Sequence, residues 1–141
     1  MKMMAFDPGF TTGVVIYNDQ PSPGASFYYP YQIQDLTPLW DTLHTEQPDQ
    51  IVYESFYYQR REKVDLRPVE AIGVIRLYCK LNNIIPVAQS AAHGKAFWTD
   101  EKIKKIGLWE PGLKHAMDAM RHMLYYQAFQ LQKIELLEAL K

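Results

Sequence analysis

Short apolar runs separated by turn-forming residues dominate the first quarter of the chain. The runs at 2–6 and 13–17 flank a turn rich in aspartate, proline and glycine, and a third run follows at 26–33. Such runs are typical of strands joined by hairpins. Pro30 lacks the backbone N–H that a sheet ladder needs, so it restricts the third strand to an edge or interrupts it. The pattern therefore predicts three antiparallel strands.

The rest of the chain alternates helical spacing with buried strands. Apolar residues at helical spacing predict helices over 36–43, 68–81, 99–106 and 113–140, the last one bent or split near its middle. Thr37 and Pro38 fit the N-cap and first position of the first helix. Continuous apolar runs at 50–53 and 84–88 predict two further strands. Because β-α-β crossovers are right-handed and make parallel neighbours, we expect a mixed five-stranded sheet with helices on its faces.

Length and composition restrict the class of protein. A chain of 141 residues buries about two-thirds of its unfolded surface in one core, so we expect a single domain over 1–141. A hydrophobic share of 48% with 22% charged residues excludes a disordered or fibrous protein. The single cysteine, Cys79, permits no internal disulfide, so a reducing compartment, the cytoplasm, is expected. No apolar run approaches a membrane span, so no membrane partner is expected.

Charge is divided unevenly along the chain. Residues 1–55 contain one base and seven acids, whereas residues 56–141 contain fourteen bases and nine acids. The net charge of −1 therefore hides a basic second part, which predicts a basic surface on part of the fold.

Two carboxylates end two of the predicted strands. Asp7 follows the first strand and Glu54 follows the fourth. The carboxyl ends of parallel neighbours meet at one sheet edge, so these side chains are expected to converge there. Close carboxylates raise one another's pKa unless they share a proton or a cation, and Mg²⁺ prefers such oxygen ligands. Gly9 and Gly13 keep the turn free of bulky side chains, which predicts room for a phosphate beside the backbone.

A third candidate element lies on the last predicted helix. His115 and Asp118 are three residues apart and so share one helix face. If this helix crosses the carboxyl edge, Asp118 completes a cluster with Asp7 and Glu54, and His115 becomes a metal ligand or a proton-transfer group. Each residue also has a structural alternative. Asp7 would be a turn residue, Glu54 a solvated acid at a strand end, and His115 with Asp118 a pair on the helix surface. No catalytic role is expected for the other three histidines, His44, His93 and His122.

Together these motifs resemble the RuvC-like Holliday junction resolvases of the RNase H-like superfamily. The resemblance rests on the turn Asp-Pro-Gly-Phe-Thr-Thr-Gly at 7–13, on Glu54 and on His115-x-x-Asp118, and it spans nearly the whole chain. It implies an RNase H-like α/β fold, in which three antiparallel strands precede two parallel ones. It also implies that Asp7, Glu54 and Asp118 are metal-binding catalytic acids and that His115 takes the fourth position. The short chain is similar to compact bacteriophage members.

Aromatic and basic residues suggest the nucleic-acid contacts. In the segment after Glu54, aromatic rings can stack on unpaired nucleobases, and basic side chains can neutralise phosphates. The candidate residues are Phe56, Tyr57, Tyr58, Arg60, Arg61, Lys63 and Arg67. A second basic group occupies 95–114, and since the family places basic residues before its last helix, Lys95 and Lys114 are favoured. The structural alternative for both groups is a solvated loop or helix surface.

The resemblance implies a metal-dependent endonuclease that resolves four-way or other branched DNA and leaves 5′-phosphate and 3′-hydroxyl ends. Mg²⁺ or Mn²⁺ is the expected cofactor, with two ions per site. The two-fold symmetry of a junction predicts a homodimer, with Tyr78 and the outer face of the last helix as candidate contacts. The alternatives are an RNase H-like nuclease for forks, flaps or RNA, and a structure-specific DNA-binding protein without catalysis. A phage protein would act in the host cytoplasm.

Overall fold

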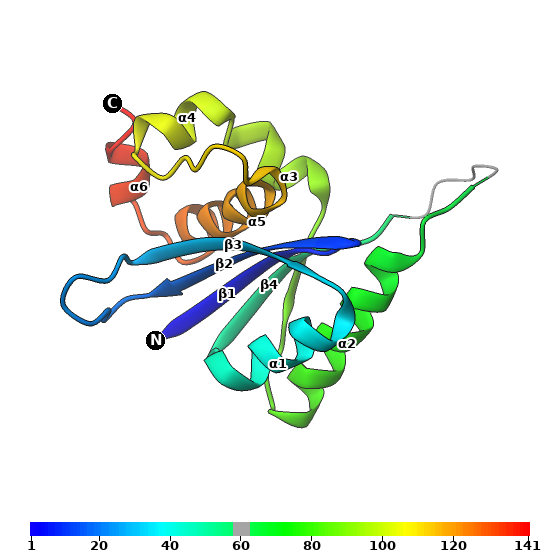
Figure 1. Ribbon diagram of the computed structural model, residues 1–141. Helices are drawn as coiled ribbons and strands as arrows, with labels where there is room; N and C mark the ends of the chain where they lie inside the picture. The colour runs from blue at the N-terminus through cyan, green and yellow to red at the C-terminus, as the bar shows by residue number, and fades with distance from the viewer. Residues whose placement is uncertain (58–62) are drawn as a thin grey trace.

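A computed structural model describes residues 1–57 and 63–141 and places one five-stranded sheet between two helical layers (Figure 1). The strand order is β3-β2-β1-β4-β5. β1 pairs antiparallel with β2 and parallel with β4, and β5 is parallel to β4. The predicted mixed sheet is therefore confirmed, with Pro30 on an edge strand. The strands are β1 (Lys2–Asp7), β2 (Thr11–Asn18), β3 (Tyr28–Gln34), β4 (Gln50–Glu54) and β5 (Val87–Gln89).

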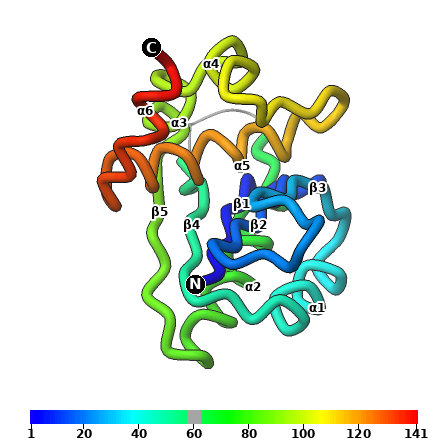
Figure 2. The backbone as a smooth tube through the Cα atoms, turned by 90° about the vertical axis from the view of Figure 1, so that its left-hand side faces the viewer, coloured from blue at the N-terminus to red at the C-terminus, as the bar shows by residue number. Residues whose placement is uncertain are grey.

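Two helices cover one face of the sheet and the remaining helices cover the other (Figures 1 and 2). The first layer holds α1 (Leu36–Glu46) and α2 (Arg67–Leu81). The second layer holds α3 (Ala91–Phe97), α4 (Asp100–Lys105), α5 (Lys114–Tyr125), the π-helix η1 (Tyr126–Gln130) and α6 (Glu135–Glu138). None of the described helices is long and apolar enough to cross a membrane.

Local details both confirm and correct the sequence predictions. The split expected near the middle of the 113–140 helix is confirmed, since η1 ends α5 and a turn separates η1 from α6. The helix α3 was not predicted. At α1 the capping residue is Asp35 and not Thr37, since the Asp35 carboxylate accepts a 2.7 Å hydrogen bond from the N–H of Leu36.

The sheet separates two apolar clusters, as the alternation of side chains along strands requires. On the α1 and α2 side, Phe6 and Val14 pack with Ile75 of α2. On the α5 side, Ala5 and Val15 pack with Met residues of α5. Tyr78 is only 3% exposed within the first cluster, so it is not available as the dimer contact that the sequence suggested.

Helix α5 lies unusually close to β2. A Cβ atom added to Gly13 would collide with the carbonyl group of His115 and come within 2.7 Å of the N atom of Ala116. The prediction that Gly13 leaves room for a phosphate is therefore wrong, because backbone of α5 fills that space. The first turn of α5 has no cap of its own; instead Gln32 of β3 accepts hydrogen bonds from the N–H groups of His115 and Ala116 at 3.0 and 3.4 Å.

Candidate active site

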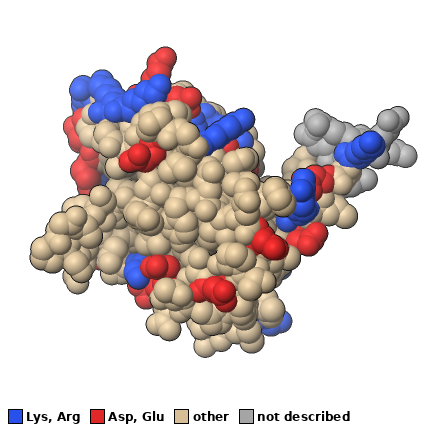
Figure 3. All heavy atoms as spheres, in the orientation of Figure 1, with Lys and Arg blue, Asp and Glu red and all other residues tan. Residues whose placement is uncertain are grey.

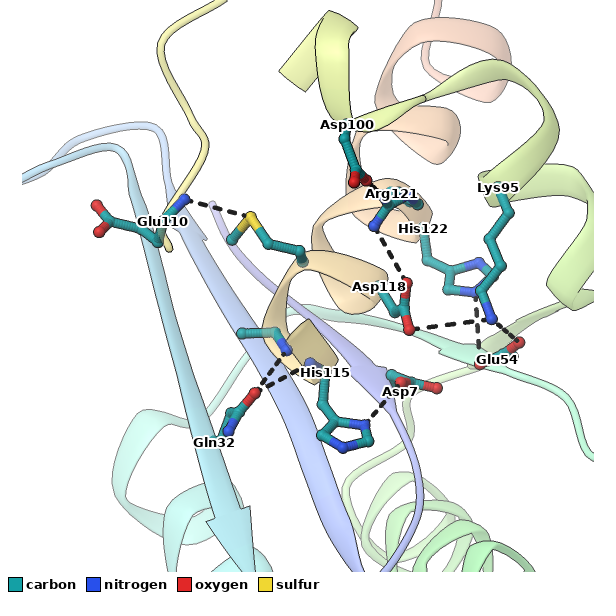
Figure 4. Close-up of polar contacts among 12 residues, drawn as sticks. Asp7, Gln32, Glu54, Lys95, Asp100, Glu110, His115, Asp118, Arg121 and His122 are labelled. Carbon is teal, nitrogen blue, oxygen red and sulfur yellow. Dashed lines mark hydrogen bonds and ion pairs between the residues drawn. The ribbon is translucent and has the colours of Figure 1, made fainter. Parts of the chain in front are cut away.

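The four predicted catalytic residues lie together at the carboxyl edge of the sheet (Figure 4). Asp7 ends β1 and Glu54 ends β4, its parallel neighbour. The first turns of α5 pass over this edge because Gly13 permits the close approach, and they bring His115 and Asp118. The Nδ1 atom of His115 lies 3.7 Å from Oδ2 of Asp7. The sequence thus placed these residues correctly, and their catalytic role is taken up below.

Lys95 of α3 lies between two of the acids. Its Nζ atom is 3.8 Å from Oε1 of Glu54 and 3.9 Å from Oδ2 of Asp118. The Lys95 side chain is 48% exposed, whereas those of Glu54 and Asp118 are 13% and 16% exposed. An ammonium group that remains in solvent can move away from the acids at little cost, so Lys95 serves as a replaceable counter-ion.

The carboxylates are crowded enough to share a proton. Burial, the hydrogen bond with Glu54 and the charges of Glu54 and Asp118 together raise the pKa of Asp7 to about 9. Burial also acts to raise the pKa of Glu54, but the hydrogen bond with Asp7 and the nearby His122 and Lys95 lower it below its usual value. Asp7 is therefore the protonated member of the pair at neutral pH.

A buried arginine holds Asp118 from behind. Burial raises the pKa of Asp118, and Nη1 of Arg121 donates a 3.1 Å hydrogen bond to its Oδ1 atom. The other guanidinium nitrogen, Nη2, pairs with Asp100 at the start of α4. Since the Arg121 side chain is only 10% exposed, this arrangement fixes one oxygen of Asp118 and leaves the other toward Lys95.

A buried histidine lies beneath Glu54. His122 is fully buried, and burial lowers the pKa of its imidazole to about 4, so the ring is neutral at neutral pH. Its Nδ1 atom is 2.9 Å from Oε1 of Gln89, and its Nε2 atom is 3.9 Å from Oε2 of Glu54. The sequence predicted no catalytic role for His122 and gave no sign that it lies next to Glu54.

The donor set suits a hard divalent cation. Three carboxylates and an imidazole surround one edge, and Mg²⁺ and Mn²⁺ take such oxygen-rich ligands. As the side chains stand, the described residues contain no three His, Cys, Asp or Glu groups arranged around a single ion. In place of a metal ion, the proton between Asp7 and Glu54 and the ammonium group of Lys95 neutralise the negative charge of the carboxylates. A cation would replace both, so Asp7, Glu54, Asp118 and His115 are the residues that would hold it.

The predicted DNA-binding residues are distributed around this edge. Tyr57 is 81% exposed, Phe56 is half-buried, and both line a cavity of about 470 Å³ that also touches Glu54 and Pro8. Lys63 and Lys114 are exposed. Arg67 is exposed, pairs with Asp65 and covers the ring of Phe10 at 4.6 Å. Three of the predicted residues fall outside the described residues: Tyr58, Arg60 and Arg61.

Basic side chains also gather over α4, on the same side of the sheet as α5 (Figure 3). They come from Lys102, Lys104 and Lys105. Lys102 and Lys104 cover the rings of Phe97 and Trp109 at 3.7 and 4.9 Å. The basic surface that the charge distribution predicted thus lies on the α5 side of the fold.

Sequence reasoning missed the residues that support the site from behind. Gln32, Gln89 and Arg121 are polar residues without a recognisable motif, and each acts across a long sequence distance. The apolar pattern gave no signal for Arg121 and His122, because at about 100° per residue both lie well away from the apolar face formed by Ala116, Ala119 and Met120.

Comparison with known proteins identifies the fold. No protein-family model and no curated protein matches the chain. Among solved structures, RuvC of Thermus thermophilus matches with a TM-score of 0.69 at 15% identity, covering 94% of this chain and 96% of that one. The T. thermophilus RuvC structure in complex with a Holliday junction substrate matches with a TM-score of 0.70, also at 15% identity, over 94% and 97% of the two chains. The chain therefore has the fold of RuvC along nearly its whole length.

Proposed function

We propose that this protein is a metal-dependent endonuclease that resolves four-way DNA junctions. The observation that carries the proposal is the convergence of Asp7, Glu54 and Asp118, whose charges are balanced by a proton shared between Asp7 and Glu54, by the largely exposed Lys95 and by Arg121 behind Asp118. A fold gains no stability from such crowding. The crowding is explained if the acids serve to hold cations. The RuvC fold supports the choice of substrate, since one RuvC structure contains a Holliday junction.

The residues of the chain have distinct parts in the proposed reaction. Asp7, Glu54 and Asp118 hold the cations, with His115 beside Asp7 as a further ligand or proton acceptor. Two divalent ions held by these residues would supply the Lewis-acid charge that activates a water molecule and stabilises the leaving oxygen. Lys95, released from the acids, is free to pair with the phosphate backbone.

The surroundings of the site suit distorted DNA. The cavity beside Glu54 is lined by Phe56 and Tyr57, whose rings can stack on an unpaired base. Lys63, Lys95 and Lys114 are exposed at the periphery and can neutralise phosphates. These features favour branched DNA over a regular duplex.

A homodimer follows from the symmetry of the substrate. Two incisions related by a two-fold axis require two active sites related by a matching axis. Tyr78 is buried, but the outer face of α2 exposes apolar side chains that can take its place in the contact: Val69, Leu77 and Leu81. Bacteriophage origin and a cytoplasmic location stay predictions from the sequence.

Cleavage of labelled substrates tests the proposal. A four-way junction, a fork, a flap, a duplex and an RNA-DNA hybrid are incubated with Mg²⁺ or Mn²⁺, with Asp118→Asn as the inactive control. We expect symmetrical paired nicks in the junction alone. Preferred cleavage of forks, flaps or the hybrid would assign another RNase H-like activity. Tight junction binding without cleavage in either metal would indicate a DNA-binding protein.

A further inference from the structure

The imidazole of His122 connects two parts of the site. His122 lies one helical turn after Asp118 on α5 and is fully buried next to Glu54 (Figure 4). Its Nδ1 atom meets Gln89 of β5 at 2.9 Å, and its Nε2 atom faces Oε2 of Glu54 at 3.9 Å. The Nε2 atom of His122 and the Nε2 atom of Gln89 have no hydrogen-bond partner among the described residues.

A neutral imidazole carries one proton, so two arrangements of this trio exist. In the first, Nδ1–H donates to Oε1 of Gln89, and the lone pair of Nε2 faces the negatively charged Glu54. Both orphaned nitrogens then stay without partners. In the second, the Gln89 amide is turned by half a rotation, so that its NH₂ group donates to Nδ1. The proton of His122 then sits on Nε2 and points at Glu54. The second arrangement replaces a repulsive contact with an attractive one.

Packing alone does not explain an imidazole at this position. The ring fits closely against Gly94, where an added Cβ atom would lie 3.2 Å from Nδ1 of His122. An apolar side chain of similar size would fill the same volume without burying unsatisfied polar atoms, which cost stability. The polar atoms of His122 face Gln89 and Glu54, so the interactions with these two side chains explain why a histidine occupies this position.

We propose that His122 is a positioning residue for Glu54, with the Glu54 carboxylate favouring the Nε2–H tautomer and the turned Gln89 amide donating to Nδ1. The Nε2–H group restrains Oε2 of Glu54 from within the core. The other oxygen, Oε1, is thereby left facing Lys95 and the open side of the site, where a cation would bind. The 3.9 Å separation is about 1 Å longer than a hydrogen bond. The contact is therefore a charge–dipole attraction and not a formed hydrogen bond. This role rests on the proposed function only in that Glu54 holds a metal.

The tautomer can be measured without substrate or metal. Long-range ¹H–¹⁵N correlations of the ¹⁵N-labelled protein distinguish protonated from unprotonated ring nitrogens, and loss of one set in His122→Gln assigns that set to His122. We expect a proton on Nε2 and none on Nδ1 at neutral pH. A proton on Nδ1 would overturn the proposal.

Two variants of matched length separate positioning from packing. Gln at position 122 retains an N–H donor near the place of Nε2, whereas Met fills similar volume without one. Mn²⁺ binding is measured by the loss of the EPR signal of free Mn²⁺. The affinity should weaken about 10–100-fold in His122→Met, as is typical when a residue that supports a metal ligand is removed, and much less in His122→Gln. Equal binding by the two variants would contradict the positioning role.

A variant outside the helix protects the test against misfolding. Glu at position 89 accepts a hydrogen bond from Nδ1–H and so turns the lone pair of Nε2 toward Glu54. We expect Gln89→Glu to weaken Mn²⁺ binding as His122→Met does, and unchanged binding would contradict the proposal. The outcome is independent of the substrate: a protein whose Mn²⁺ binding depends on His122 and Gln89 as expected, but which cleaves no junction, refutes only the proposed function.

Discussion

Helices α2 and α5 pack on opposite faces of one sheet, but they bury different kinds of side chain. Of its fifteen residues α2 buries four, none of them charged, and its outer face exposes Leu77 and Leu81. Of its twelve residues α5 buries eight, including Arg121 and His122. Burying polar groups costs free energy unless they are paired. The difference indicates that α2 buries an apolar face only, whereas the deep burial of α5 places Asp118, supported by Arg121, at the sheet edge beside Asp7 and Glu54.

The largest expected effect comes from the glycine that admits α5. Gly13→Ala places a methyl group against the α5 backbone, so it should destabilise the protein by about 2–3 kcal/mol and abolish junction cleavage. The matched control is Gly73→Ala on α2, where the added Cβ meets nothing within 4 Å. This control should stabilise by about 0.5–1 kcal/mol because alanine favours helix. Urea unfolding measures both, and equal effects would remove the distinction between the two helices.

Asp7→Asn should separate stability from activity. It should abolish cleavage, since it removes a carboxylate that we propose as a metal ligand, while folding and junction binding persist. The folded-state pKa of Asp7 is about 9 against a usual value of 3.8, so the folded protein binds this proton more tightly than the unfolded chain. The contribution of Asp7 to stability is therefore complete below about pH 4 and falls as the pH rises toward 9.

Asparagine does not ionise, so the Asp7→Asn protein does not lose this stability as the pH rises. At pH 8 without metal, Asp7→Asn should therefore be more stable than the wild type by about 0.5–2 kcal/mol. Thermal unfolding between pH 5 and 9 measures the effect. The exposed acid Glu70 on α2 supplies the control, since Glu70→Gln should change neither stability trend nor cleavage. If metal-free Asp7→Asn is less stable than the wild type at pH 8, repulsion among the carboxylates does not destabilise the folded protein, and the raised pKa of Asp7 is contradicted.

His115 is expected to have a smaller effect than the acids. His115→Asp retains a hard oxygen ligand beside Asp7 and should keep substantial Mg²⁺-dependent cleavage. His115→Ala should reduce cleavage about 10–100-fold because it removes the ligand. His44→Ala on α1, whose imidazole bonds the Trp40 carbonyl, serves as the control. If His115→Ala cleaves as well as the wild type, His115 is only a helix-surface residue.

The smallest effect concerns the surface charges. Lys114→Ala at the start of α5 should lower the slope of log affinity against log salt by about 1, since one phosphate contact is lost. Lys80→Ala near the end of α2 should leave the slope unchanged, because α2 lies on the other face of the sheet. Binding titrations at several salt concentrations compare them. An equal change in slope for both would place DNA on the α2 face as well.

The main features of the fold were predictable because they depend on local patterns. Apolar runs and turn residues located the strands, and the parallel relation of β1 and β4 brought Asp7 and Glu54 to one edge. The position of α5 was not predictable from spacing, since it depends on Gly13 and on the cap from Gln32, both distant in sequence. The placement of His122 beside Glu54 was not predictable either, because its neighbours Gln89 and Glu54 are brought to it only by the tertiary structure.

The central claim is that the crowded acids at the α5 edge exist to bind divalent cations. Crystals of the protein soaked in Mn²⁺ test it directly, through anomalous difference density. We predict Mn²⁺ peaks among Asp7, Glu54 and Asp118, with Lys95 displaced from its present contacts. Saturating Mn²⁺ that leaves this edge without a peak, with Lys95 still beside Glu54 and Asp118, would contradict the account.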